Sequence, residues 1–211
     1  MPFRDRAQAG DLLAKRLAEF APEHPLVLAL PRGGVPVAAP VARALHAPLD
    51  VIVARKLGAP GNEELGIGAV APGGVRVLDE RLIAALHVPP EHVARVTAKE
   101  QREVARRLMA YRGSPDPPDA RGRFVILVDD GLATGVTARA ALASLRQAGA
   151  SRVVLAVPVG AADTVDALQP EADGIVCLEC PLDFRAVGVW YDDFRPTSDD
   201  EVVDLLAASR H

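Results

Sequence analysis

Cysteine and aromatic residues are scarce in this sequence of 211 residues. The two cysteines, Cys177 and Cys180, form a single C-x-x-C, and no second pair is present to complete a zinc site. No thioredoxin-like strand and helix follow them, so we interpret both as thiols in or near the core, in a reducing compartment. Aromatic residues make up 4% of the chain and hydrophobic residues 49%, which predicts a core built mainly of aliphatic side chains.

The sequence also lacks a basic excess and a long apolar segment. Its formal net charge is -4, which argues against a nucleic-acid surface, because proteins that follow a phosphate backbone carry more basic residues. Residues 1–10 are charged and have no apolar run like that of a secretory signal, and no segment approaches the length of a transmembrane helix. We therefore expect a cytoplasmic protein with no membrane or nucleic-acid partner.

Short apolar segments alternate with helical segments along the chain. Strands are expected at residues 26–30, 51–54, 124–128, 153–157 and 174–178, and helices at 5–20, 35–45, 136–147 and 163–168. Apolar strands that alternate with helices indicate an α/β fold, in which helices cover both faces of a parallel sheet. Ligands bind beyond the carboxyl ends of such strands, and the Gly-rich loops of this chain lie at those ends.

One region departs from this alternation. Residues 66–71 and 75–78 predict a hairpin, and residues 91–111 predict a charged helix that lies largely on the surface. A proline-rich stretch at 114–119 cannot be helical and ends the region. We predict a single domain over 1–211, with a core at about 21–178, an insertion at about 66–122 and a small hood or tail at about 179–211 that ends in a helix at 199–208.

The segment from Val125 to Thr137 carries the clearest chemical pattern. A buried strand ends in Asp129 and Asp130, small residues follow, and a helix begins near Val136. Backbone N–H groups, the helix dipole and the hydroxyls of Thr134 and Thr137 would form a cradle for an anion. The paired carboxylates would repel a second phosphate but accept hydrogen bonds from neighbouring hydroxyls. The pattern predicts a sugar-phosphate site; the alternative is an ordinary turn in which an Asp caps the helix.

This stretch resembles the motif with which type I phosphoribosyltransferases bind 5-phosphoribosyl 1-pyrophosphate (PRPP): four apolar residues, two acids, then small residues ending in T-G-x-T. The resemblance implies that Asp129 and Asp130 are catalytic and hold the ribose hydroxyls. It also implies a loop for the 5'-phosphate of PRPP. The residues of that loop are Gly131, Ala133, Thr134, Gly135 and Thr137. Neither a G-x-G-x-x-G nor a P-loop is present as a competing nucleotide motif.

Two other loops support this resemblance. Arg32, Gly33 and Gly34 lie where the family has its pyrophosphate loop, which often contains a strained or cis peptide. Arg55 and Lys56 resemble a basic pair of adenine phosphoribosyltransferases and would neutralise the departing pyrophosphate. The alternatives are a plain turn for the first loop and solvated surface cations for the second.

The resemblance further implies a reaction in which PRPP releases pyrophosphate and an acceptor nitrogen attacks its sugar. Mg²⁺ would bridge the pyrophosphate and the ribose hydroxyls with few protein ligands, so no residue is assigned to the metal. Residues 57–66 are the expected lid, and Glu63 in it is the proposed general acid or base, with Glu64 as an alternative and a solvated loop charge as another. Oxopurine enzymes carry an acid where this chain has Ala133, so the loop looks nearest to the adenine type.

The acceptor site is expected in the aromatic tail at 181–194, where Phe184 and Tyr191 could stack on a flat heterocycle. These aromatic residues could equally attach the tail to the core. The predicted function is therefore phosphoribosyl transfer to a nitrogenous, possibly purine-like, base. The main alternative is a non-catalytic PRPP or nucleotide sensor on the same fold. A hydrolase with Asp129 as nucleophile would require Asp-x-Asp, which is missing. The resemblance makes a homodimer plausible, although nothing in the residues requires one.

Overall fold

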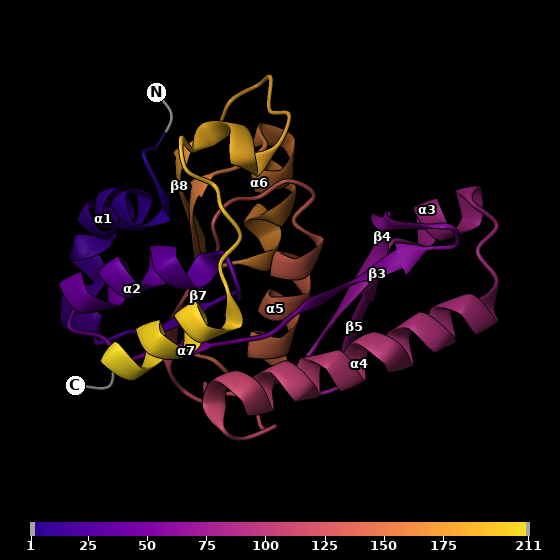
Figure 1. The fold of residues 1–211 in the computed structure, drawn as a ribbon, viewed down its shortest axis with the longest axis horizontal. Helices are drawn as coiled ribbons and strands as arrows, with labels where there is room; N and C mark the ends of the chain where they lie inside the picture. Colours follow the sequence, from indigo (N-terminus) through magenta and orange to yellow (C-terminus); the bar gives the residue numbers. More distant parts are fainter. Residues whose placement is uncertain (1–2, 210–211) are drawn as a thin grey trace.

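Five parallel strands form the central sheet of the computed structural model, which describes residues 3–209 (Figure 1). The sheet has the order β2-β1-β6-β7-β8, and every neighbouring pair is parallel. Its strands are β1 (Leu26–Ala29), β2 (Leu49–Val51), β6 (Phe124–Val128), β7 (Arg152–Val159) and β8 (Gly174–Glu179). The predicted α/β fold with a parallel sheet is confirmed, although β2 ends three residues earlier than the predicted strand at 51–54.

Helices cover both faces of this sheet because its strands carry apolar side chains on both sides. Along β1 and β6, Val27 and Ile126 face one core cluster, whereas Leu28 and Leu127 face the other. The first cluster lies under α1 (Arg6–Leu17), α2 (Gly34–Ala44) and α7 (Asp199–Ala208). The second lies under α5 (Val136–Gln147) and α6 (Ala162–Leu168). Short 3-10 turns occur at Ala18–Glu23, Gln169–Glu171 and Val187–Trp190.

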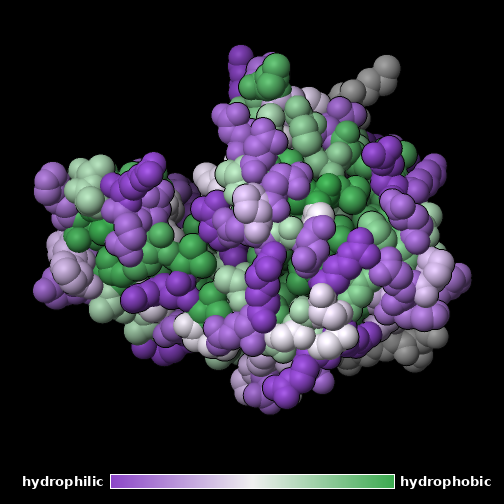
Figure 2. Space-filling model, turned by 180° about the vertical axis from the view of Figure 1, so that it is seen from behind, coloured by the Kyte–Doolittle hydropathy of each residue, from purple (hydrophilic) through white to green (hydrophobic). Residues whose placement is uncertain are grey.

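A second, antiparallel sheet belongs to an inserted unit that projects to one side of the core (Figures 1 and 2). It consists of β3 (Arg55–Ala59), β4 (Asn62–Ala71) and β5 (Val75–Leu78), followed by α3 (Glu80–Ala85) and α4 (Pro90–Arg112). The hairpin β4–β5 is as predicted. The loop predicted at 57–66 is instead the hairpin of β3 and β4, so the second sheet begins at Arg55 rather than near residue 66. A bulge at Leu57 to Ala59 interrupts the register of this hairpin and hides its strand pattern in the sequence.

The inserted unit is tied to the core by polar contacts at two places. At the β4–β5 turn, the Ser144 hydroxyl of α5 donates a 2.8 Å hydrogen bond to the Pro72 carbonyl. At the end of α4, Arg112 forms a 2.9 Å ion pair with Asp50 of β2. The helix α4 lies largely on the surface, as predicted, and one stripe of it packs inward. The buried residues of this stripe are Val93, Thr97, Glu100, Val104, Leu108 and Tyr111.

Several smaller expectations can also be compared with the structure. The helices predicted at 136–147 and 199–208 have the predicted bounds. The short α3, which begins at the capping residue Asp79, was not predicted. Cys177 is half-buried as expected, but Cys180 is exposed, so its placement in the core was wrong. Among the helices of residues 3–209, none has the length and apolar character needed to cross a membrane.

Candidate functional site

The loop between β6 and α5 presents two carboxylates and a helix N-terminus at the carboxyl edge of the sheet. Asp129 and Asp130 directly follow the buried β6, and α5 begins after Gly135, which has a φ of 69°. No side chain caps α5, so the N–H groups of its first turn remain free of side-chain partners. The Thr164 hydroxyl of α6 fixes the loop by donating a 2.7 Å hydrogen bond to the Ala133 carbonyl. This geometry suits an anion at the start of α5.

Thr134 and Thr137 lie beside this helix N-terminus and are accessible to a ligand. Thr134 is exposed and Thr137 is partly exposed. Gly131 is partly covered by the tail, since a Cβ there would meet the Val187 side chain at 2.6 Å. The loop predicted for the 5'-phosphate is therefore open at its threonines and closed on the side of the tail.

The two carboxylates occupy different electrostatic environments. Burial raises the pKa of Asp129 well above its usual value, and the neighbouring charge of Asp130 raises it further. Asp129 accepts a 2.8 Å hydrogen bond from the backbone N–H of Asp130. Burial also raises the pKa of Asp130, but Arg6 opposes the rise through a 2.8 Å ion pair. The loop thus holds two carboxylates in a poorly solvated place, and only one of them is paired with a cation of the described chain.

The predicted pyrophosphate loop packs directly against these carboxylates. A Cβ on Gly33 would overlap the carboxylate of Asp130, and one on Gly34 would lie 2.7 Å from the Val128 carbonyl oxygen. Glycine is therefore required here by close packing. The peptide between Pro31 and Arg32 is cis, as the resemblance led us to expect.

Arg32 points from this loop toward the start of α7. Its guanidinium lies 3.6 Å from the Asp199 carboxylate, which also accepts a 2.6 Å hydrogen bond from the Tyr111 hydroxyl of α4. This contact links the predicted pyrophosphate loop to the inserted unit and to the last helix.

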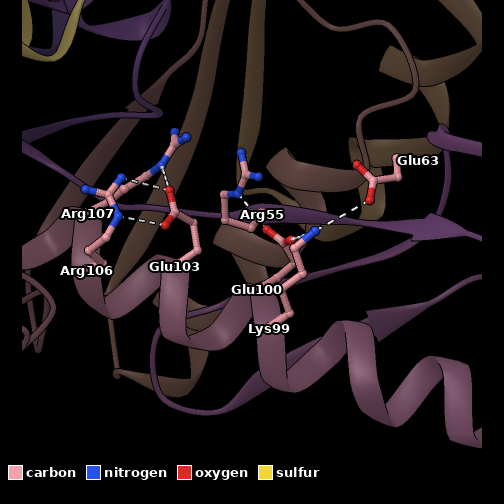
Figure 3. A network of polar contacts seen from close by, with 7 residues as sticks. All are labelled: Arg55, Glu63, Lys99, Glu100, Glu103, Arg106 and Arg107. Carbon is pink, nitrogen blue, oxygen red and sulfur yellow. Dashed lines mark hydrogen bonds and ion pairs between the residues drawn. The ribbon is translucent and has the colours of Figure 1, made fainter.

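Both cations of the basic pair at the start of β3 have carboxylate partners, and Figure 3 shows that Arg55 faces α4. Arg55 forms a 2.8 Å ion pair with the buried Glu100 of α4. Lys56 donates a 2.6 Å hydrogen bond to the Glu64 carbonyl and lies 3.2 Å from the Glu64 carboxylate. Its side-chain carbons also lie against Gly66, which faces Val136 at the start of α5. Lys56 therefore lies on the side of the hairpin that faces the first residue of α5.

A groove of about 790 Å³ separates the β3–β4 hairpin from α4. Charged residues of both signs line it, including Arg55, Lys56 and Glu63, but neither Asp129 nor Asp130 does. Glu63 lies on β4 with 86% of its side chain exposed and is 3.5 Å from Lys99 (Figure 3). Within residues 3–209, its ion pair is with Lys99, so the structure does not bring Glu63 to the two aspartates.

The aromatic tail contacts the motif loop, but the Tyr191 ring is buried and is not exposed to a ligand. The Tyr191 hydroxyl donates a 2.6 Å hydrogen bond to the Asp130 carbonyl, and its buried ring stacks on Phe194 at 5.2 Å. Phe3 covers the ring further at 5.4 Å. Phe184 is half-buried and packs against the same aromatic cluster. These contacts match the alternative in which the tail aromatics attach the tail to the core.

One residue at the site, Arg6 of α1, was missed by the sequence interpretation. It lies 124 positions from Asp130 in the chain, in a helix whose apolar spacing was its only signal. Glu100 and Asp199, which hold Arg55 and Arg32, were likewise missed, because nothing local marks them as partners of distant arginines.

Comparison with known proteins agrees with this geometry. The model of the phosphoribosyl transferase domain matches residues 6–193, so the chain belongs to the phosphoribosyl transferase family. A protein of Mycobacterium tuberculosis strain H37Rv named "Putative phosphoribosyl transferase Rv0571c" is 48% identical over 204 residues. The match covers 97% of this chain and 46% of that protein, so this chain spans about half the length of that relative.

Solved structures show the same fold. The crystal structure of TT1426 from Thermus thermophilus is 44% identical, covers 99% of both chains and has a TM-score of 0.82. A hypoxanthine phosphoribosyltransferase from Staphylococcus aureus has a TM-score of 0.50 at 11% identity, with 87% of this chain and 79% of that chain covered. The second likeness shows the fold alone.

Proposed function

We propose that this protein transfers 5-phosphoribose from PRPP to a nitrogenous base, for example a purine-like one, and releases pyrophosphate. The observation that carries the proposal is the juxtaposition of paired carboxylates and an uncapped helix N-terminus on the loop from Asp129 to Thr137. In this proposal the 5'-phosphate binds at the start of α5, and the ribose hydroxyls donate to Asp129 and Asp130.

The chemical step breaks the bond between C1 of the sugar and the pyrophosphate oxygen, which leaves with the electron pair. A bond from the acceptor nitrogen to C1 forms on the opposite face, and the nitrogen loses its proton to a general base. Glu63 takes this role in the proposal, when the β3–β4 hairpin tip approaches the sugar. The protein contributes mainly by positioning the reactants and stabilising charge.

In this proposal a magnesium ion arrives with the substrate. Within residues 3–209, no cluster of three or more His, Cys, Asp or Glu side chains could hold a metal by itself. Mg²⁺ prefers oxygen ligands and keeps several waters, which suits an ion held mainly by the pyrophosphate of PRPP. When bound, it would neutralise part of the charge on the leaving pyrophosphate.

Three basic residues, Arg32, Arg55 and Lys56, would contact the pyrophosphate. Each is already paired with a carboxylate, and these partners are Asp199, Glu100 and Glu64 respectively. Binding would exchange a carboxylate for a phosphate oxygen, so the net gain per contact is smaller than for an unpaired cation.

Calorimetric titration with PRPP and Mg²⁺ tests the proposal. We expect wild type to bind and Asp129→Asn/Asp130→Asn to lose at least about tenfold in affinity, since one good hydrogen bond to a charged group is worth more than 1.4 kcal/mol. The exposed pair Asp166→Asn/Asp204→Asn is the matched control and should bind as wild type does. A screen of bases for pyrophosphate release then identifies the acceptor. Absence of PRPP binding by wild type would refute the proposal.

A further inference from the structure

Arg6 projects from the first turn of α1 onto the carboxylate of Asp130. Its Nε lies 2.8 Å from Asp130 Oδ2, and only 11% of the Arg6 side chain and 17% of the Asp130 side chain are exposed. Burying a guanidinium this far is costly unless its charge is paired and its N–H groups are hydrogen-bonded. The contact is therefore a specific feature of the fold, and it lies at one of the two carboxylates assigned to the sugar hydroxyls.

Residues of the C-terminal tail also contact the Arg6 guanidinium. Arg6 Nη1 donates a 2.8 Å hydrogen bond to the Arg195 carbonyl, and the Phe194 ring centroid lies 3.9 Å from Arg6 Cζ. Tyr191, which stacks on Phe194, donates to the Asp130 carbonyl. Arg6 thus joins three segments: the first helix, the loop after β6 and the aromatic tail.

This arrangement orients the Asp130 carboxylate and leaves most of its hydrogen-bond acceptor positions available. An ionised carboxylate has about four lone-pair positions, and Arg6 occupies one of them on Oδ2. The remaining positions can accept hydrogen bonds from ligand hydroxyls. Gly33 leaves the space in which the carboxylate sits.

We propose that Arg6 is a positioning residue that fixes the orientation and the charge of Asp130, so that this carboxylate can accept a ribose hydroxyl of PRPP. The inference rests on the proposed function and extends it to α1 and the tail, which lie outside the loop that carries the motif. Arg6 acts through Asp130 and has no chemical step of its own.

The charged and titratable groups around Asp130 determine how the loss of Arg6 would change the protonation of Asp130. Asp129 faces it from the same loop, Tyr191 from the tail and Arg6 from α1, while Asp193 of the tail faces Arg6. Arg6 is the cation in this set that opposes the effect of burial on Asp130. Without it, Asp130 would hold a proton to higher pH, and a protonated carboxyl has less capacity to accept hydroxyl hydrogen bonds.

The test is calorimetric titration of Mg²⁺–PRPP, and separately of Mg²⁺–pyrophosphate, into wild type and Arg6 variants between pH 6 and 9. Wild type should bind PRPP with less pH dependence than Arg6→Gln, because Arg6 opposes the effect of burial on Asp130. Arg6→Gln should bind PRPP more weakly than wild type, with the largest deficit at pH 6, because without Arg6 burial raises the pKa of Asp130 further and a larger fraction of it is protonated. The deficit should shrink as the pH rises. Pyrophosphate, which has no ribose hydroxyls, should bind both proteins alike. Arg4→Gln, a change at an exposed arginine nearby, is the control and should behave as wild type does.

A double-mutant cycle with Asp130→Asn separates a positioning role from a structural one. If Arg6 acts through Asp130, adding Arg6→Gln to Asp130→Asn should change PRPP affinity by less than about threefold, because coupled sites are non-additive. A pH-independent loss, an equal loss in the Asp130→Asn background or an equal loss of pyrophosphate binding would overturn the inference. Unaltered PRPP binding by Arg6→Gln would overturn it as well.

Two further outcomes are decisive. If Arg6→Gln does not fold, Arg6→Lys replaces it: the charge is kept but the fork that spans Asp130 and Arg195 is lost. We expect this variant to bind PRPP several-fold more weakly without new pH dependence, and unchanged binding would overturn the inference. If wild type itself does not bind PRPP, the proposed function has failed, which is distinct from a wild type that binds and an Arg6 variant that binds equally well.

Discussion

At position 33 the chain has no room for a side chain, and this makes glycine there a testable part of the site. A Cβ on Gly33 would overlap the Asp130 carboxylate and lie 3.2 Å from Arg6 Nε. Replacement by alanine must therefore push the carboxylate away from its partner. Both groups are largely buried, so neither can turn into solvent without disturbing the packing around it.

We expect Gly33→Ala to lower the free energy of unfolding by about 1–3 kcal/mol, the usual cost of overpacking, and to weaken PRPP binding because Asp130 is displaced. Urea unfolding and PRPP calorimetry measure the two effects. Gly174→Ala on β8 is the control, since its Cβ would meet the Val154 side chain at an ordinary 3.6 Å. A Gly33→Ala protein with wild-type PRPP affinity would contradict this account of the loop.

At the scale of single residues, the sequence predicts site residues that are close together in the chain and misses contacts between residues that are far apart in it. Asp129, Asp130 and the threonines follow one strand within a few positions, so the pattern alone places them together. Arg6 could not be found in this way, because its partner lies on another element and its own helix gives only an apolar periodicity. The paired state of Arg55 was missed for the same reason, since Glu100 is an acid in a helix rich in charges of both signs.

Among the elements, the pairing of β3 with α4 offers the sharpest test. Glu100 is buried and pairs with Arg55, whose side chain is 34% exposed. We expect Glu100→Gln to lower the free energy of unfolding by about 1–2 kcal/mol, less than for a fully buried pair, because solvent screens Arg55. The same change frees Arg55 and should tighten the binding of inorganic pyrophosphate with Mg²⁺, measured by calorimetry.

The control for this prediction is Glu91→Gln, an exposed position in the first turn of the same helix. It should leave pyrophosphate affinity unchanged. Weaker pyrophosphate binding by Glu100→Gln would mean that Glu100 orients Arg55 for the ligand rather than competing with it.

Helices and strands with a regular pattern of apolar residues were predicted well, and elements with an interrupted or short pattern were not. The helix at 136–147 follows a buried strand and ends before Gly149, so its bounds could be predicted from local signals. The strand β3 could not, because Gly58 and the bulge beside it break the alternation that marks a strand. The short α3 was missed because six residues carry too little periodicity to predict a helix.

For the whole molecule, the packing of the insertion and the tail onto the core follows from contacts between parts that the sequence keeps far apart. The clearest junction is at Asp199, the first residue of α7. Its carboxylate accepts a hydrogen bond from the Tyr111 hydroxyl of α4 and lies beside Arg32 of the predicted pyrophosphate loop. The element order could be predicted from alternation, but this junction depends on three side chains from three separate segments. No periodic pattern relates them.

Replacing Tyr111 by phenylalanine tests this junction. The tyrosine is buried, and burial, followed by the hydrogen bond to Asp199, raises its pKa to about 12, so at neutral pH it acts as a hydrogen-bond donor. Loss of the hydroxyl should lower the free energy of unfolding by about 1 kcal/mol at pH 7, the usual net value of a hydrogen bond. In wild type the hydrogen bond from Tyr111, aided by Arg32, lowers the pKa of Asp199.

A carboxyl with a lowered pKa stabilises the folded state above its unfolded pKa, and this contribution is lost as the pH falls through the folded value. The difference between wild type and Tyr111→Phe should therefore be largest near pH 7 and shrink toward pH 3. Urea unfolding at both pH values measures it, with Asp200→Asn in the same turn as a control for general charge effects. A deficit of the same size at both pH values would contradict the prediction, because it would show that the contribution of the Tyr111 hydroxyl does not depend on the charge of Asp199.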